Sequence, residues 1–329
     1  MSVKRSLINP ILSRIGSRSY LLILSASVLL LGITACGQVI ATSTATAVPT
    51  PTPLPTATPA PTLQPGDFQR TLMVNGLERT YLLHIPAGLD SSRPLPLVFA
   101  LHGYDNEIHF EISDLVNMTG FNDIADGSRF VVVYPSGVSG VWNAGTCCGT
   151  ASENNIDEKS FFRQILADLG KSFNIDAKRI YATGFSMGGM MAFRLACEMS
   201  DTFAAVAPVA GALVDTPCQP DQPVSLMQVH GKNDNAVPYN GGLGGFMTGT
   251  YKFPPVPVSL ATWAQLDGCS ATATTEKQGI ASHTVYPGCK GGSSVELYTI
   301  DALGNNWPSQ YVLPVSQMIW DFFKAHPKP

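Results

Sequence analysis

The fold of this chain is decided by the stretch Ile180-Tyr181-Ala182-Thr183-Gly184-Phe185-Ser186-Met187-Gly188-Gly189. Its first four residues predict a strand, and the apolar residues within 190–195 predict a helix directly after the turn. The glycines around the serine suit a turn that is too tight for side chains. A serine between such a strand and helix is a candidate nucleophile, and the alternative is an ordinary serine that caps the helix.

Apolar runs of strand length recur along the chain, with helix-like stretches between them. The runs lie at 96–101, 130–134, 180–183, 204–207, 224–229 and 295–300, and the helices are expected at 157–172, 187–199, 259–267 and 315–325. Buried strands that alternate with helices imply a mostly parallel sheet with right-handed crossovers. Two alternating segments around Asn75-Gly76 predict an antiparallel hairpin at 68–85 that leads into this sheet.

Ligands of parallel sheets bind beyond the carboxyl ends of the strands, so the residues that follow each apolar run are informative. His230-Gly231 and then Asp234 follow the run at 224–229. In the chain order serine, acid, base, an acid in this loop orients the general base. Asp234 is therefore predicted to be the orienting carboxylate, and the alternative is a residue that only forms the turn.

The loop after 96–101 begins with His102-Gly103-Tyr104. In sites of this kind one oxyanion N–H comes from that loop, and the other comes from the residue after the nucleophile. The backbone N–H groups of Tyr104 and Met187 are therefore predicted to stabilise the oxyanion. His102 is predicted to be a structural histidine that orients the loop.

These segments together resemble the polyhydroxybutyrate depolymerase and feruloyl esterase group of secreted α/β-hydrolases. The likeness runs from about residue 67 to 325, and it is carried by 184–189, 142–149, 203–211 and the block from His230 to Tyr239 that contains Asp234. The resemblance implies an α/β-hydrolase fold, with a mostly parallel central sheet flanked by helices and an N-terminal antiparallel hairpin. It also implies an ester hydrolase with a serine nucleophile.

One position departs from the family pattern. The final motif of the family reads Gly-His-x-Trp-Pro, whereas this chain has Gly304-Asn305-Asn306-Trp307-Pro308. Asn305 therefore stands where the resemblance places the general base. An amide has no useful basicity near neutral pH, whereas imidazole takes the serine proton there and returns it to the leaving group.

Two other histidines are candidate replacements for the missing base. His109 follows the run at 96–101, and His283 precedes Cys289; either residue is otherwise an ordinary surface histidine. Trp142 and Trp307 are predicted to wall an aromatic-tolerant cleft, and the alternative is that both rings pack beneath the loops.

Two functions remain open at this point. The chain hydrolyses a small-molecule or polymer-borne ester, or it is a catalytically degenerate lipoprotein that binds an ester, glycan or hydrophobic ligand in the retained cleft. No cofactor is expected, and a zinc site is disfavoured because no C-x-x-C or H-x-x-x-H spacing occurs. A net charge of −4 without a basic run after the leader makes nucleic acid an improbable partner, and a monomer is expected.

The N-terminus predicts export. Residues 1–35 combine a basic start with an apolar stretch and small residues, which is typical of a signal peptide of the lipoprotein type. Ile33-Thr34-Ala35-Cys36 resembles a bacterial lipobox, so Cys36 is predicted to carry the lipid that anchors the protein to a membrane; the alternative is an ordinary signal peptide with a chance cysteine. A Thr- and Pro-rich tether at 36–66 precedes the esterase-like domain at 67–329. The expected location is the bacterial cell surface or the extracellular space.

Six further cysteines in an exported chain indicate disulfides. The pairs Cys197 with Cys218 and Cys269 with Cys289 are expected. That leaves Cys147 and Cys148 either to bridge each other or to rearrange the set.

Overall fold

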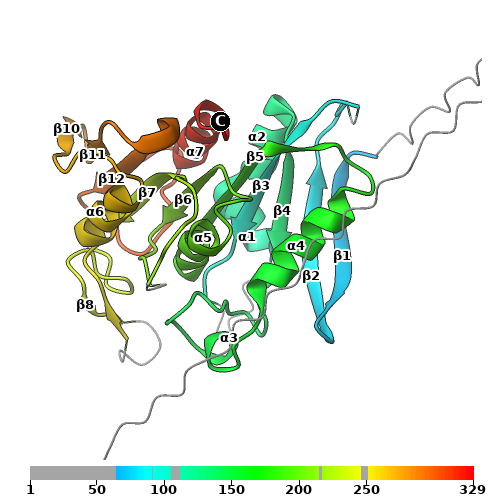
Figure 1. The fold of residues 1–329 in the computed structure, drawn as a ribbon, viewed down its shortest axis with the longest axis horizontal. Coiled ribbons are helices and arrows are strands. Elements are labelled where there is room, and N and C mark those ends of the chain that lie inside the picture. The colour runs from blue at the N-terminus through cyan, green and yellow to red at the C-terminus, as the bar shows by residue number, and fades with distance from the viewer. Residues whose placement is uncertain (1–63, 91, 105–111, 215–216, 246–250) are drawn as a thin grey trace, which may run out of the picture. The chain divides into compact units, whose positions relative to one another are not determined.

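The computed structural model describes residues 64–90, 92–104, 112–214, 217–245 and 251–329 (Figure 1). The predicted signal peptide, the lipidation site at Cys36 and nearly all of the tether at 36–66 lie outside these residues. Within the described ranges, no helix combines the length and the apolar character that crossing a membrane requires.

Ten strands of the described residues form one sheet, with parallel strands in its centre and antiparallel strands at both edges (Figure 1). In spatial order they are β1 (Gly66–Val74), β2 (Leu77–Ile85), β4 (Val131–Pro135), β3 (Leu95–Leu101), β5 (Ile175–Phe185), β6 (Ala205–Val209), β7 (Ser225–Gly231), β12 (Val295–Ile300), β11 (Ala281–Tyr286) and β10 (Thr274–Gln278). The strands from β4 to β12 in this order pair in parallel. A small separate sheet joins β8 (Gly242–Leu243) to β9 (Lys252–Phe253).

Helices cover both faces of the large sheet. Helices α4 (Glu158–Leu169), α5 (Met187–Glu198) and α6 (Val256–Leu266) contribute to one apolar cluster. Helices α1 (Ile112–Thr119), α2 (Phe121–Ser128) and α7 (Val315–Ala325) contribute to a second cluster on the other face. A short helix α3 (Thr150–Glu153) and a 3₁₀ turn at Lys290–Gly292 complete the helical elements of the described chain.

Strand β3 shows why the central strands read as continuous apolar runs. All seven of its residues are buried. Leu97, Phe99 and Leu101 join the first cluster, whereas Val98 and Ala100 join the second. Successive side chains of a strand point to opposite faces, so a strand covered on both faces has no position for a polar residue.

The predicted fold is confirmed in its main features. The six apolar runs correspond to the six parallel strands, and the hairpin at 68–85 corresponds to β1 and β2. Asn75 and Gly76 form its turn with positive φ angles of 50° and 83°, as a two-residue hairpin loop requires. The sequence did not predict the antiparallel edge formed by β10 and β11, nor the helices α1 and α2.

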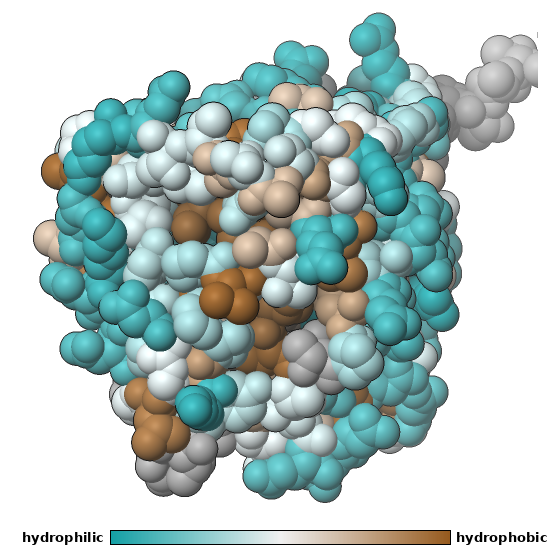
Figure 2. All heavy atoms as spheres, turned by 60° about the vertical axis from the view of Figure 1, so that its left-hand side comes forward, coloured by the Kyte–Doolittle hydropathy of each residue, from teal (hydrophilic) through white to brown (hydrophobic). Residues whose placement is uncertain are grey.

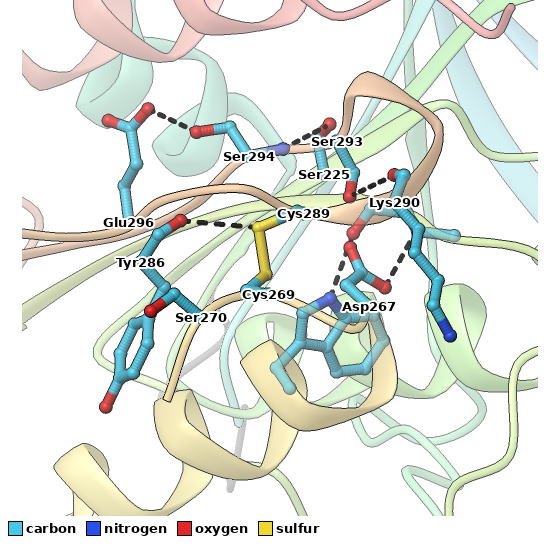
Figure 3. The surroundings of a disulfide bond; sticks show 12 residues. Ser225, Asp267, Cys269, Ser270, Tyr286, Cys289, Lys290, Ser293, Ser294 and Glu296 are labelled. Carbon is cyan, nitrogen blue, oxygen red and sulfur yellow. Dashed lines mark hydrogen bonds between the residues drawn. A yellow bond between two sulfur atoms is a disulfide. The ribbon is translucent and has the colours of Figure 1, made fainter. Parts of the chain in front are cut away.

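The disulfide pairing is also confirmed. Cys197 bonds to Cys218, Cys269 bonds to Cys289, and the neighbours Cys147 and Cys148 bridge each other. Figure 3 shows the Cys269–Cys289 bond, which ties the end of α6 to the segment before β12. Asp267 and Lys290 lie beside it, and the Lys290 N–H donates to the Asp267 carbonyl at 2.9 Å.

The surface is mixed in character. Figure 2 shows the side of the molecule that lies on the left in Figure 1, where apolar residues gather near the centre of a mostly hydrophilic face. Val258 of α6 and Ile280 of the β10–β11 turn are about half exposed. Scattered exposure of this kind is normal for a folded protein.

Candidate active site

Ser186 sits alone between β5 and α5. The strand ends at Phe185, the helix begins at Met187, and Ser186 itself has φ 52° and ψ −112°. A positive φ at a residue with a side chain is strained by roughly 1–3 kcal/mol and persists only where the surroundings enforce it. The structure therefore has the strand–turn–helix geometry that the sequence predicted around Ser186.

Two glycines allow this turn to form. A Cβ on Gly188 would overlap the backbone of Leu101 and His102, and one on Gly184 would overlap the backbone of Gly188. The turn is thus packed directly against the loop that follows β3. Any larger residue at these positions would push the serine away from that loop.

Backbone groups hold the turn in place from the other side. The Ser186 N–H donates to the carbonyl of Val209, at the end of β6, at 2.8 Å. Met187 is the first residue of α5, so its N–H has no acceptor within the helix. The N-terminus of a helix carries partial positive charge, which suits a developing oxyanion.

The loop after β3 is fixed by His102. Its Nδ1 donates to the Gly103 carbonyl at 2.6 Å, and its Nε2 accepts the Gly137 N–H at 2.9 Å. The Trp142 ring N–H donates to the His102 carbonyl at 3.0 Å. His102 is therefore the loop-orienting residue that the sequence predicted, and Tyr104 continues from the segment that it holds.

Asp234 lies in the turn after β7 and is buried. Its Oδ1 accepts the N–H groups of Ala236 and Val237 at 2.9 and 2.8 Å. Its Oδ2 accepts the side-chain amide of Asn305 at 2.8 Å. The structure thus brings together the predicted acid and the residue in the predicted place of the base, although 71 positions separate them.

The two loops that carry these residues run side by side. The Lys232 N–H donates to the Ile300 carbonyl and the Asn233 N–H donates to the Leu303 carbonyl, both at 3.0 Å. Gly231 permits this approach, because a Cβ there would overlap the Leu303 backbone. Since β5, β6, β7 and β12 are neighbours in the sheet, the loops of Ser186, Asp234 and Asn305 emerge from the same edge.

Comparison with known proteins agrees with this architecture. Residues 74–280 match the family described as "Putative esterase". The chain belongs to this esterase family. The solved structure of an acetyl xylan esterase from Aspergillus awamori matches with a TM-score of 0.55 at 16% identity, covering 78% of this chain and 99% of that one. It confirms the α/β-hydrolase fold.

Two curated relatives are similar in sequence. Feruloyl esterase B of Piromyces equi is 30% identical over 262 residues, which cover 76% of this chain and 46% of the relative. A bifunctional acetylxylan esterase/xylanase of Neocallimastix patriciarum is 33% identical over 157 residues, which cover 48% of this chain and 22% of the relative. The esterase-family chain thus spans less than half the length of either relative.

Of the two candidate replacement bases, the structure describes His283 but not His109. His283 lies on β11, where its Nε2 is 2.9 Å from Glu296 Oε2 and its ring stacks on Tyr298. This pairing occupies His283 on β11, the strand beyond β12. His109 lies outside the described residues. The histidine beside the predicted acid is His230, whose Nε2 is 3.2 Å from Asp234 Oδ2.

Both predicted cleft tryptophans are buried. Trp142 is 0% exposed, and Trp307 is 7% exposed with its ring N–H donating to the Ser316 hydroxyl at 3.0 Å. These positions fit the alternative interpretation, in which both rings pack beneath the loops. A cavity of about 660 Å³ lies beside His102, and Ser186, Asp234 and Asn305 are not among its lining residues.

A buried ion pair that the sequence reasoning missed supports the segment with Trp142. Arg79 donates to Glu158 at 2.9 Å, and the other oxygen of Glu158 accepts the Asn143 N–H at 3.1 Å. Burial raises the pKa of Glu158, and the Arg79 guanidinium opposes that shift. The signal for this pair was weak, because nothing in the sequence links position 79 to position 158.

Among the described residues, no cluster of three or more His, Cys, Asp or Glu side chains is arranged to hold a metal ion. The groups that the described residues bring to this edge are the hydroxyl of Ser186, the carboxylate of Asp234, the amide of Asn305 and the nearby backbone N–H groups. These groups are suited to acyl transfer, except that a basic nitrogen is missing from position 305.

Proposed function

We propose that this protein is a carboxylic-ester hydrolase in which Ser186 is the nucleophile and Asp234 the acid, and that turnover is slow because Asn305 stands in the place of the base. The observation that carries the proposal is the 2.8 Å hydrogen bond from Asn305 Nδ2 to Asp234 Oδ2. A triad histidine would donate to the same carboxylate from one ring nitrogen. The amide makes that bond but adds no proton acceptor of comparable basicity.

The backbone N–H groups proposed as oxyanion donors would favour attack on an ester. Ser186 would attack the carbonyl carbon, and the N–H groups of Met187 and Tyr104 would stabilise the oxyanion. Each such donor is worth about 3–4 kcal/mol of transition-state stabilisation. Collapse of the tetrahedral intermediate would break the bond to the alcohol, which would leave with a proton from water. A second water would then hydrolyse the acyl-serine and release the acid.

Proton transfer is where the site differs from a complete triad. Because Nδ2 of Asn305 donates to Asp234, its Oδ1 is the polar atom left to accept a hydrogen bond. An amide oxygen orients a hydroxyl but does not take up its proton near neutral pH. The serine proton would therefore pass to water or hydroxide, and the rate would follow hydroxide concentration.

The names of the relatives suggest which esters to test first. Two of them are called feruloyl esterase B and bifunctional acetylxylan esterase/xylanase. We propose feruloyl and acetyl esters as the substrate class, with aliphatic polyester oligomers as the comparison set. The preferred acyl group is then identified by comparing kcat/KM of the Asn305→His variant on these esters.

The decisive experiment compares the wild type with Asn305→His and Ser186→Ala on p-nitrophenyl acetate and methyl ferulate. Restoring histidine is expected to raise kcat/KM at pH 7 by at least about 10³-fold, because removing the base of a triad costs about 10⁶-fold. Ser186→Ala in the restored background is expected to abolish the gain. An unchanged rate in Asn305→His would instead favour a protein that only binds a ligand.

We also propose that the domain is exported and tethered through a lipid on Cys36. The support is the sequence of the leader and the Thr- and Pro-rich segment that follows it. Mass spectrometry of the mature N-terminus tests this proposal. A diacylglycerol-modified cysteine that disappears in Cys36→Ser is expected, and an unmodified N-terminus elsewhere would contradict it.

A further inference from the structure

We infer that His230 is a positioning residue for Asp234: its Nε2–H lies 3.2 Å from the carboxylate oxygen that also accepts the amide of Asn305. This inference rests on the proposed function, because it concerns the acid of that site. The geometry, burial and hydrogen bonding of the ring support it independently of Asn305.

The hydrogen bonds of His230 define its protonated nitrogen. His230 is the penultimate residue of β7, and its side chain and that of Asp234 are both 0% exposed. Its Nε2 lies 2.9 Å from the Val237 carbonyl, which can only accept. Nε2 therefore carries the proton, and the same N–H lies 3.2 Å from Asp234 Oδ2.

The two carboxylate oxygens are held by different kinds of donor. Oδ1 accepts two backbone N–H groups from the turn, those of Ala236 and Val237. Among the described residues, Oδ2 accepts the side-chain amide of Asn305 and has the Nε2–H of His230 beside it at 3.2 Å. The backbone thus fixes where the carboxylate sits, and the side chains fix how Oδ2 faces position 305.

The other ring nitrogen shows that stability alone does not account for this histidine. His230 Nδ1 is buried and has no hydrogen-bond partner in the described structure. A buried polar atom without a partner costs free energy, because it has given up its hydrogen bond to water. An apolar side chain of similar size would avoid this cost. The contacts of Nε2 with Val237 and Asp234 are therefore what distinguishes an imidazole from an apolar residue at this position.

The Nε2–H of His230 therefore also lies beside the charge of Asp234. The titratable groups that face the His230 ring are Asp234 and Tyr239, whose ring centroid is 6.1 Å from that of His230. A proton acceptor placed at 305 would interact with a carboxylate whose Oδ2 already has the polar N–H of His230 beside it. Removing the His230 N–H would strengthen the attraction between Asp234 and a cation at 305.

The first test uses the Asn305→His background. His230→Leu is expected to lower kcat about tenfold with little change in KM, because Oδ2 loses its restraint. The pH at which kcat/KM is half-maximal is expected to rise by roughly half a unit. His230→Gln, whose amide can donate from a similar place, is expected to restore both values.

The matched control is Gln228→Leu. Gln228 is buried on the same strand and face, and its amide donates to the Gly211 carbonyl at 2.8 Å. It is expected to lower stability without moving the half-maximal pH. A shift in the control as large as that in His230→Leu, or no shift and no loss of kcat in His230→Leu, would overturn the inference.

The second test does not depend on activity. In the wild-type chain, urea midpoints are measured for His230→Leu, Asp234→Asn and the double variant. Interacting residues give non-additive effects, so the double variant is expected to lose less than the sum of the single losses. Additive losses would refute the contact, whereas failure of Asn305→His to gain activity would refute only the proposed function.

Discussion

The turn that carries Ser186 and the loop that carries Asn305 lie at the same edge of the sheet, but they are built differently. The first is held by its backbone: a strained serine, two glycines in close packing and a hydrogen bond to Val209. The second holds its side chain through one hydrogen bond to Asp234. The amide of Asn305 makes this bond, but it has no basic nitrogen that could accept a proton. The geometry of this loop therefore does not depend on a base at position 305.

The largest expected effect concerns the acid. In the Asn305→His background, Asp234→Asn is expected to reduce kcat by about 10⁴-fold, because the imidazole loses the carboxylate that orients it. In the wild type the same substitution is expected to change kcat less than about tenfold, since no imidazolium forms at 305. Steady-state rates of all four proteins at pH 7 measure the contrast. Equal losses in both backgrounds would show that Asp234 acts on something other than residue 305.

The pH dependence sharpens the same contrast. For the wild type, log kcat/KM is expected to rise with a slope of about one per pH unit up to at least pH 9, because hydroxide takes the proton. Asn305→His is expected to reach a plateau near neutral pH and to exceed the wild type there by about 10³-fold. Rates of p-nitrophenyl acetate hydrolysis from pH 5 to 9 decide it. A wild-type plateau near pH 7 would reveal another base.

A pair of glycine substitutions tests the difference in construction directly. Gly188→Ala is expected to destabilise the protein by about 3 kcal/mol or more and to abolish activity, because its Cβ would overlap the backbone of Leu101 and His102. Gly304→Ala is the matched control: the nearest atom to its Cβ would be Asn306 Nδ2 at 3.5 Å, an ordinary contact. It is expected to change stability by less than about 1 kcal/mol. Urea unfolding compares them, and equal losses would contradict the contrast.

The smallest expected effect lies away from both loops, at Asp267 beside the Cys269–Cys289 disulfide (Figure 3). Burial raises the pKa of this carboxyl to about 6, and one of its oxygens has no hydrogen-bond partner in the described structure. The folded state therefore binds a proton more tightly than the unfolded state. The stability that this proton contributes is complete below about pH 4 and is lost as pH rises to about 6.

Asp267→Asn is expected to remove this pH dependence. Its amide oxygen can still accept the Val224 N–H that now donates to Asp267 Oδ1 at 3.3 Å. At pH 7 the variant is expected to be more stable than the wild type by about 1–3 kcal/mol, and at pH 4 the two are expected to be equal. Urea unfolding at both pH values measures this, and esterase activity should not change. A variant that is less stable at pH 7 would contradict the sign.

Much of the fold could be predicted because its central strands are covered on both faces. A run such as Pro96 to Leu101 has no polar position, and that pattern identifies it without any knowledge of its neighbours. The edge hairpin lacks this signal, since every residue of β10 is exposed and its sequence is Thr-Thr-Glu-Lys-Gln. The pairing of β10 with β11 therefore depends on backbone hydrogen bonds that composition does not reveal.

The sequence by itself determined the turn that carries Ser186 and the amide at position 305, because glycine spacing and residue identity are local properties. Only the tertiary structure decided that the Asp234 carboxylate accepts the amide of Asn305 and lies beside the ring of His230. It also decided that Trp142 packs under the loop after β3 instead of facing solvent. These contacts join positions that are distant in the chain, and their geometry is set by the order of strands in the sheet.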